Sequence, residues 1–187
     1  MFNHDLLILD IEATGLDVTK HEIIQLAAVL LDKKTLKEKA YFTSYIKPKY
    51  WNRRVPESMA VCGITWDDVK NAPSVRTVLQ RFTKMFGKNV LPTTYGGNLD
   101  IVFLPAAYRT AKLAYPFDYH TFNMWALCYT FMAKKHKLTN TKRFAGFRLE
   151  EIAKVLGVRV PENRHDALVD CRFEADVLRK LVKAIKV

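Results

Sequence analysis

The order of the strand and helix patterns is the feature that most restricts how this chain can fold. Three stretches typical of β-strands come first, at residues 5–12, 22–32 and 38–48, although the second is long enough to form a helix instead. Amphipathic helix patterns begin only afterwards, and they alternate with two further strand patterns at 89–97 and 115–122. This order predicts an α/β domain built on a mixed β-sheet.

Helix patterns follow the third strand. Short helical turns with Thr65 as a cap are expected first, and longer helices at 73–87, 98–112, 123–135, 148–158 and from about Asp166 onward. The buried stripe of the last helix is expected to contain Leu168, Cys171, Ala175, Leu178, Val182 and Ile185. Residues 136–146 read as a polar, basic loop. We find no internal repeat and no linker, so residues 1–187 are expected to form one domain.

The chain is strongly basic. It has 30 lysines and arginines against 19 acids, a formal charge of +11, which favours a polyanionic partner. Nucleic acid is the first such partner and an anionic membrane the second, although a basic surface also serves solubility alone.

The three cysteines, Cys62, Cys128 and Cys171, are widely spaced, and no pair has zinc-finger spacing. We therefore expect buried, reduced thiols in a cytoplasmic protein. The N-terminal stretch has neither the basic start of a secretion signal nor an apolar run long enough to span a bilayer, so no membrane partner is expected.

Two carboxylates close the first strand pattern, in the stretch "LLILDIEATGLD". Asp10 and Glu12 are two residues apart, so their side chains leave a strand on the same face. Ligand sites of α/β sheets commonly lie at the carboxyl ends of strands, where this pair stands. Strands also end in polar residues without any function, and the pair by itself is weak evidence for a site.

Further acids stand near the starts of two helices. Asp100 falls near the start of the helix expected at 98–112, where an acid also stabilises the helix dipole. In "HDALVD", His165 precedes the last helix and Asp170 lies in its second turn. Both are explained equally simply as solvated residues at a helix start. However, Asp170 neighbours the apolar stripe, and an acid beside a buried seam needs a partner or a cation.

Taken in order, these stretches resemble the DEDDh exonucleases, the group of DnaQ-like proofreading 3′→5′ exonucleases, RNase T and oligoribonuclease. "LDIEATGLD" resembles the first family motif, "GGNLDIVFL" the second, and "HDALVD" the third, with its histidine-x-Ala-x-x-Asp pattern. The stretch "VPESMAVCGITWDDVKNAPSV" resembles the segment between the first two motifs, so the resemblance covers about residues 5 to 183. It implies a ribonuclease H-like mixed five-stranded sheet flanked by helices.

Three positions depart from the common family pattern. Ala13 stands where many members have threonine, "TYGGN" replaces the commoner His-Asn start of the second motif, and Cys62 precedes "GIT" where histidine is frequent. These departures leave the four carboxylates intact. They leave the details of substrate contact open.

The resemblance implies a metal-dependent 3′→5′ exonuclease that releases nucleoside 5′-monophosphates. Asp10, Glu12 and Asp170 would hold the more tightly bound of two Mg²⁺ or Mn²⁺ ions. Asp10 would bridge to the second ion, which Asp100 would assist through water. Carboxylates suit such ions, and a pair of ions roughly 4 Å apart holds the attacking and leaving oxygens of a phosphoryl displacement. His165 would take the proton from the attacking water, a role suited to histidine near neutral pH.

The resemblance also implies substrate contacts from Ala13, Thr14, Gly15, Leu16, Val61 and Tyr95. The backbone amides of Thr14 and Gly15 would approach the sugar and phosphate of the terminal nucleotide, and Leu16 would pack against a base. Without the flanking acids, "TGLD" would read as an ordinary glycine turn.

Basic residues cluster in "KPKYWNRR" and "KKHKLTNTKR". In the first stretch Tyr50 and Trp51 stand among the cations, a mixture suited to stacking on single-stranded bases. Each stretch alone is equally well explained as a solvated loop.

The leading hypothesis is an exonuclease acting on nucleic acid 3′ ends, with single-stranded DNA favoured and RNA as the second choice. The alternative is a catalytically silent nucleic-acid-binding or polymerase-associated module, against which the complete set of catalytic positions argues. A phosphohydrolase built on His165 and Asp166 would need further histidine ligands, and the remaining histidines lack a suitable pattern. The sequence leaves open the DNA or RNA preference, a polymerase or replication partner and the oligomeric state.

Overall fold

The computed structural model describes residues 2–96, 98–135, 147–162 and 165–185, apart from the side chains of Asn98 and Leu99. Five strands form one sheet in the order β3-β2-β1-β4-β5. Their bounds are β1 Asp5–Ala13, β2 Ile23–Leu31, β3 Glu38–Tyr45, β4 Val90–Thr94 and β5 Phe122–Asn123. Because β1 pairs antiparallel with β2 and parallel with β4, the expected mixed sheet is confirmed.

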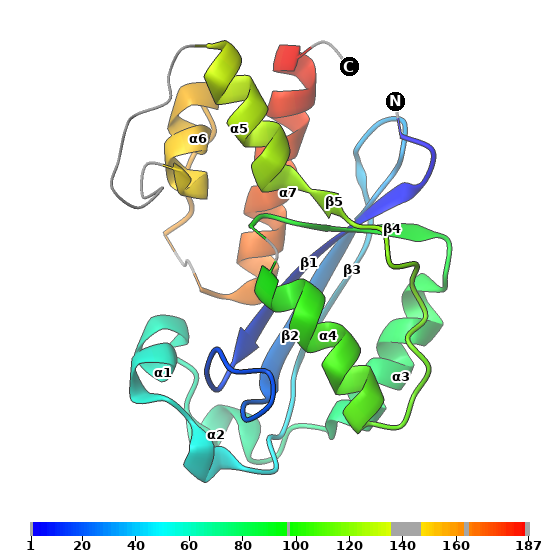
Figure 1. Cartoon of the computed structure of the whole chain (residues 1–187), viewed down its shortest axis with the longest axis vertical. Coiled ribbons are helices and arrows are strands. Elements are labelled where there is room, and N and C mark those ends of the chain that lie inside the picture. Colours follow the sequence, from blue (N-terminus) through cyan, green and yellow to red (C-terminus); the bar gives the residue numbers. More distant parts are fainter. Residues whose placement is uncertain (1, 97, 136–146, 163–164, 186–187) are drawn as a thin grey trace.

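Helices cover both faces of this sheet (Figure 1). Their bounds are η1 Trp51–Arg53, α1 Pro56–Cys62, α2 Trp66–Val69, α3 Val75–Phe86, α4 Asn98–Thr110, α5 Met124–Lys134, α6 Leu149–Leu156 and α7 Ala167–Ile185. Helices α3 and α4 pack on one face, and α7, joined by α5 and α6, packs on the other. Figure 1 shows the end of β1 pointing toward α1, in the space between the starts of α4 and α7.

The alternation of side chains along β1 decides which face carries its acids. Leu7 and Leu9 pack in the core beneath α3 and α4, whereas Leu6 and Ile8 pack beneath α7. Side chains two residues apart on a strand share a face. Asp10 therefore continues the row of Leu6 and Ile8, and the acidic end of β1 faces α7.

The strand patterns were predicted correctly except for the last one. Residues 22–32, which the pattern also allowed as a helix, contain the strand β2. The strand expected at 115–122 is wrong in most of its length, since only Phe122 and Asn123 pair with β4. Pro116 has no amide hydrogen to donate to a ladder, and the Asp118 side chain accepts a hydrogen bond from the His120 amide (2.9 Å), which closes a turn instead.

The helix patterns are confirmed within the described residues. Thr65 caps α2 in a capping box with Asp68, and Gly157 ends α6 with a left-handed backbone (φ 66°). The expected stripe of α7 packs inward as predicted. The basic loop expected at 136–146 lies outside the described residues. Among the described helices, none combines the length and the apolar character that crossing a membrane requires.

Candidate active site

The end of β1 presents two carboxylates on the face that α7 covers. Asp10 lies opposite Ala27 of β2 and Glu12 lies opposite Gln25, and the regular pairing is interrupted directly after Glu12. Ala13 still pairs with Ile23 after this irregularity, and the strand ends there. The antiparallel ladder with β2 thus holds both acids near the end of β1.

A third carboxylate is held by the free edge of β1. The parallel pairing with β4 extends only as far as Ile8, opposite Thr93, so later amides on that edge have no strand partner. Asp100, in the first turn of α4, accepts the amide hydrogen of Ile11 through its Oδ1 (3.2 Å). This bond pairs the Ile11 amide, which has no partner on β4, and it brings Asp100 beside the acids of β1.

The start of α7 is fixed by its own cap and by β2. Asp166 accepts hydrogen bonds from the amides of Leu168 (3.0 Å) and Val169 (3.1 Å), as an N-cap residue does. Gln25 accepts a bond from the amide of Ala167 (3.3 Å), which ties the helix start to the strand that pairs with β1. Asp166 therefore has a structural task, which weakens the reading of His165 and Asp166 as a phosphohydrolase pair.

His165 and Asp170 are joined by a direct hydrogen bond. The amide of His165 donates to Oδ2 of Asp170 (3.0 Å), and His165 has a left-handed backbone with φ 69°. Asp170 is only 7% exposed, whereas the side chain of His165 is exposed. The bond places the histidine above the buried carboxylate, with its ring in solvent.

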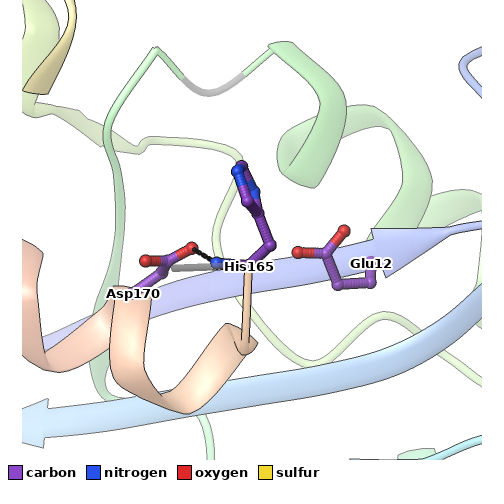
Figure 2. Close-up of side chains that lie close together, drawn as sticks. All are labelled: Glu12, His165 and Asp170. Carbon is purple, nitrogen blue, oxygen red and sulfur yellow. Dashed lines mark hydrogen bonds between the residues drawn. The ribbon is translucent and has the colours of Figure 1, made fainter. Parts of the chain in front are cut away.

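Residues more than 150 positions apart in the sequence meet at this point. One ligand atom from each of Glu12, His165 and Asp170 lies within 4.8 Å of the other two. Figure 2 shows the carboxylates of Glu12 and Asp170 on either side of His165, each directed toward it. The convergence of the first strand and the last helix is the arrangement that the sequence motifs predicted.

Burial and mutual repulsion raise the pKa values of these acids. Burial is the main cause of raising the pKa of Glu12 to about 8, followed by the charges of Asp170 and Asp100. Burial raises the pKa of Asp100 to about 6, partly offset by the hydrogen bond from Ile11. The pKa of Asp10 is well above its usual range, because of burial first and then the charges of Asp100 and other nearby acids.

This donor set fits a hard divalent cation. Oδ2 of Asp10 is buried and has no hydrogen-bond partner among the described residues. Within the same part of the chain, no lysine or arginine forms an ion pair with Asp10, Glu12 or Asp100. Mg²⁺ and Mn²⁺ prefer carboxylate oxygens and would supply the missing positive charge.

The raised pKa values predict how stability depends on pH without metal. Glu12 (about 8, against an ordinary 4.5) and Asp100 (about 6, against 3.8) bind protons more tightly in the folded protein than in the unfolded chain. The stability that this tighter proton binding gives the folded protein is therefore fully present below the ordinary pKa values of the two groups. It is lost as the pH rises through about 6 and then about 8. We expect the melting temperature in EDTA to fall over this interval.

Adding Mn²⁺ should reverse this loss, with the largest rise in melting temperature at the alkaline end, because ligands must lose their protons to bind a cation. Thermal unfolding at several pH values, with EDTA or Mn²⁺, measures both effects. A metal-free melting temperature that climbs steadily across the same interval would contradict the prediction.

A fifth acid, Glu174, was not among the predicted site residues. It lies four residues after Asp170 on the buried face of α7 and is 6% exposed. Its charge acts on Asp10 more strongly than that of Glu12 or Asp170 does. The contact of the Cys171 thiol with the Ile8 carbonyl (3.7 Å) holds this part of α7 against β1. The i, i+4 spacing from Asp170 was the available signal, since such residues share a helix face.

Glu174→Gln is expected to weaken Mn²⁺ binding at least about fivefold, because about 1 kcal/mol of attraction is lost when a nearby negative charge is removed. Titration calorimetry or the electron paramagnetic resonance signal of free Mn²⁺ measures the affinity. Asp176→Asn is the matched control, since Asp176 lies on the same helix but is exposed and pairs with Arg179. Equal affinities in both variants would exclude a role for Glu174 in cation binding.

The turn after β1 is tightly held. Thr14 donates its amide to the Glu22 carbonyl (2.9 Å), and its hydroxyl accepts from the Glu22 amide (3.0 Å). This differs from the expectation that the Thr14 amide contacts a nucleotide, because that donor is already used inside the turn. Gly15 is required here: a Cβ at this position would lie 2.5 Å from ring atoms of His21.

The other predicted substrate residues fall into two groups. Leu16, in the turn, is 71% exposed, and Val61, on α1, is 57% exposed, so both offer apolar surface to solvent. Tyr95 is half-buried, and its hydroxyl donates to the Phe147 carbonyl, which gives it a structural role. Ala13 ends β1.

A cavity of about 450 Å³ lies beside this turn, lined by His21, Glu22, Trp66, Phe103 and others. None of the four motif carboxylates lines it. The cavity is therefore separate from the cluster of acids.

The sequence of this chain is similar to those of known exonucleases and DNA polymerase subunits. A family model described as "Exonuclease" (RNase T) matches residues 7–178. The DNA polymerase III subunit epsilon of Aquifex aeolicus is 29% identical over 183 residues, which cover 96% of this chain and 81% of that protein.

Two solved structures share the fold. The nuclease domain of 3′hExo, a DEDDh family member bound to rAMP, superposes with a TM-score of 0.76 at 23% identity, covering 96% of this chain and 92% of that one. The zinc-bound E. coli ExoI–ssDNA complex gives a TM-score of 0.81 at 18% identity, covering 98% of this chain but only 41% of that one. The ribonuclease H-like sheet flanked by helices is thus confirmed at the level of fold.

Proposed function

Because the chain belongs to the RNase T exonuclease family, among the DEDDh 3′→5′ exonucleases, we propose that it removes nucleotides one at a time from nucleic acid 3′ ends. The observation that carries this proposal is the convergence of Glu12, His165 and Asp170 beside two further acids at the end of β1. Single-stranded DNA is the favoured substrate and RNA the second, since a 3′ end must be unpaired to enter such a site.

The motif carboxylates are the proposed ligands of two divalent ions, Mg²⁺ or Mn²⁺. They are Asp10, Glu12, Asp100 and Asp170. When bound, the ions stabilise the negative charge that develops on the oxygens of the phosphoryl group during its transfer. The buried Oδ2 of Asp10, which has no hydrogen-bond partner among the described residues, and the burial that raises the pKa values of Glu12 and Asp100 support this assignment, because a bound cation would offset the cost of burying these carboxylates.

His165 is the proposed general base. Its ring lies in solvent above the carboxylates, where a water molecule has access, and its backbone is held by Asp170. The ring takes a proton from the water that attacks the last phosphodiester. The bond from phosphorus to the 3′ oxygen of the shortened strand breaks, and a nucleoside 5′-monophosphate leaves.

The turn after β1 is the proposed seat of the terminal nucleotide. Gly15 keeps the turn compact, because its lack of a side chain leaves room for the His21 ring. Leu16 and Val61 supply exposed apolar surface of the kind that packs against a base. Ala13, Thr14 and Tyr95 remain predicted contacts.

The test offers the protein 3′-labelled single-stranded DNA, single-stranded RNA and duplex DNA with Mg²⁺. Release of labelled mononucleotides from the single-stranded DNA first is the expected result. Release from RNA alone would reverse the predicted preference. A well-folded protein that binds these strands but leaves all of them intact would support the catalytically silent module instead.

Three further features remain predictions. They are a polymerase or replication partner, a cytoplasmic location, and a single exonuclease domain that spans residues 1–187. The first is consistent with the relative of similar length, which is named as a subunit of DNA polymerase III.

A further inference from the structure

The segment that joins β3 to α1 carries two pairs of a ring and a cation, of which the Tyr50 ring is exposed and the Trp51 ring is half-buried. The guanidinium carbon of Arg53 lies 4.1 Å from the centre of the Tyr50 ring, and that of Arg54 lies 5.1 Å from the Trp51 ring. Tyr50 is 48% exposed, and both arginines are exposed. A surface of this kind offers flat apolar faces and positive charge together.

Backbone hydrogen bonds tie this segment to the turn after β1. The amide of Val55 donates to the Thr14 carbonyl (2.7 Å), and the amides of Lys49 and Tyr50 donate to the carboxylate of Glu22 (3.1 and 2.8 Å). Thr14 is two residues beyond Glu12, a span of at most about 7 Å of backbone. The segment that carries the ring–cation pairs therefore lies beside the turn that follows the carboxylates of β1.

The segment is also anchored from below. Trp51 packs on the buried residues Ile24 and Ile64, and its ring lies 5.5 Å from that of Trp66, measured between ring centres. Tyr50, by contrast, has no such aromatic neighbour among the described residues. The backbone is thus fixed while the Tyr50 ring stays open to solvent, which lowers the entropic cost of stacking on it.

We propose that Tyr50, Arg53 and Arg54 bind the nucleotides that precede the scissile bond in a single-stranded substrate. The Tyr50 ring stacks on an unpaired base, and the two guanidinium groups contact the phosphates on either side. The charge of the surface complements a polyanion, and the exposed ring selects a strand with free bases over a duplex. This inference rests on the proposed function and names the surface along which the strand reaches the acidic site at the end of β1.

The test measures how affinity grows with strand length. Fluorescence anisotropy in EDTA gives dissociation constants for labelled thymidine 5′-monophosphate and for an oligothymidylate of twelve nucleotides, using wild type and the double variant Tyr50→Ala/Arg53→Ala. The variant is expected to bind the twelve-nucleotide strand about tenfold more weakly, with a shallower dependence on salt. Its affinity for the mononucleotide, which has no preceding nucleotide to contact this surface, should stay within about twofold.

The matched control is Tyr119→Ala/Arg109→Ala. Tyr119 is 83% exposed in the loop between α4 and β5, and Arg109 is exposed in the last turn of α4, so the same chemical groups are removed elsewhere. This control should bind both the mononucleotide and the twelve-nucleotide strand as wild type does. Tyr50→Trp, which keeps a flat ring, should bind the longer strand close to the wild-type level.

Failure of this inference is distinguishable from failure of the proposed function. Wild type is tested separately, with Mg²⁺, on the p-nitrophenyl ester of thymidine 5′-monophosphate, which has no preceding nucleotide. Hydrolysis of the ester together with wild-type affinity of Tyr50→Ala/Arg53→Ala for the twelve-nucleotide strand would overturn only the strand route. No release of nitrophenol, and no cleavage of any strand, would overturn the function on which it rests.

Discussion

Asp10→Asn is expected to slow nucleotide release by at least about 1,000-fold, since about 4 kcal/mol of transition-state stabilisation depends on the cations this residue helps to hold. Asn has the size of Asp but no charge, so the fold is retained. Asp10 has a buried oxygen without a hydrogen-bond partner among the described residues, and its pKa is well above the usual range because of burial and nearby acids. Loss of the charge should therefore also raise the stability of the metal-free protein.

The rate is measured as mononucleotide release from a 3′-labelled strand with Mg²⁺, and cation binding by titration with Mn²⁺. Asp5→Asn is the matched control, because Asp5 lies on the same strand at its other end and pairs with Lys39 (2.7 Å) near the surface. The control should keep wild-type activity. An Asp10→Asn protein as active as Asp5→Asn would remove Asp10 from the centre.

His165→Ala is expected to reduce turnover by about 100- to 10,000-fold, the usual contribution of a general base. Binding of Mn²⁺ should persist, because the carboxylates are untouched. His165 has a left-handed backbone (φ 69°), which alanine adopts less readily than asparagine does. His165→Asn therefore serves as a second variant that removes the base with less strain on the backbone.

The decisive measurement is the rate as a function of pH for wild type and both variants. Both variants should stay about 100- to 10,000-fold slower than wild type at every pH at which the divalent cation saturates the carboxylates. His120→Ala, which alters an exposed histidine paired with Asp118, is the control and should behave as wild type. Unchanged rates in both His165 variants would exclude this residue as the base.

Local periodicity was enough to predict most of the strands and helices that carry the acids of the site. Asp10 and Glu12 share a face because strands alternate, and the ordered motifs indicated that Asp100 and Asp170 would join them. The contact between Asp100 and the Ile11 amide had no local signal, since it depends on β4 ending its pairing at Ile8. Such a bond is decided by the register of two strands far apart in the sequence.

Other features required the packed structure. Glu174 has the spacing of a residue on the buried face of α7, but an acid on a helix is usually exposed, so its burial was not predicted. The Thr14 amide was expected to be available, yet it is used by the Glu22 carbonyl. The length of the last strand was overestimated. Only Phe122 and Asn123 form β5, because the residues just before them form a turn closed by the hydrogen bond from the His120 amide to Asp118.

The junction of β1 with α7 has a consequence for the making of the protein. On the proposed mechanism both Asp10 and Asp170 are needed, and the ribosome adds Asp170 160 residues after Asp10. A nascent polypeptide that has not yet reached Asp170 therefore lacks part of the proposed cation site. On this mechanism, cleavage of nucleic acid starts only after α7 has been made and has packed on β1.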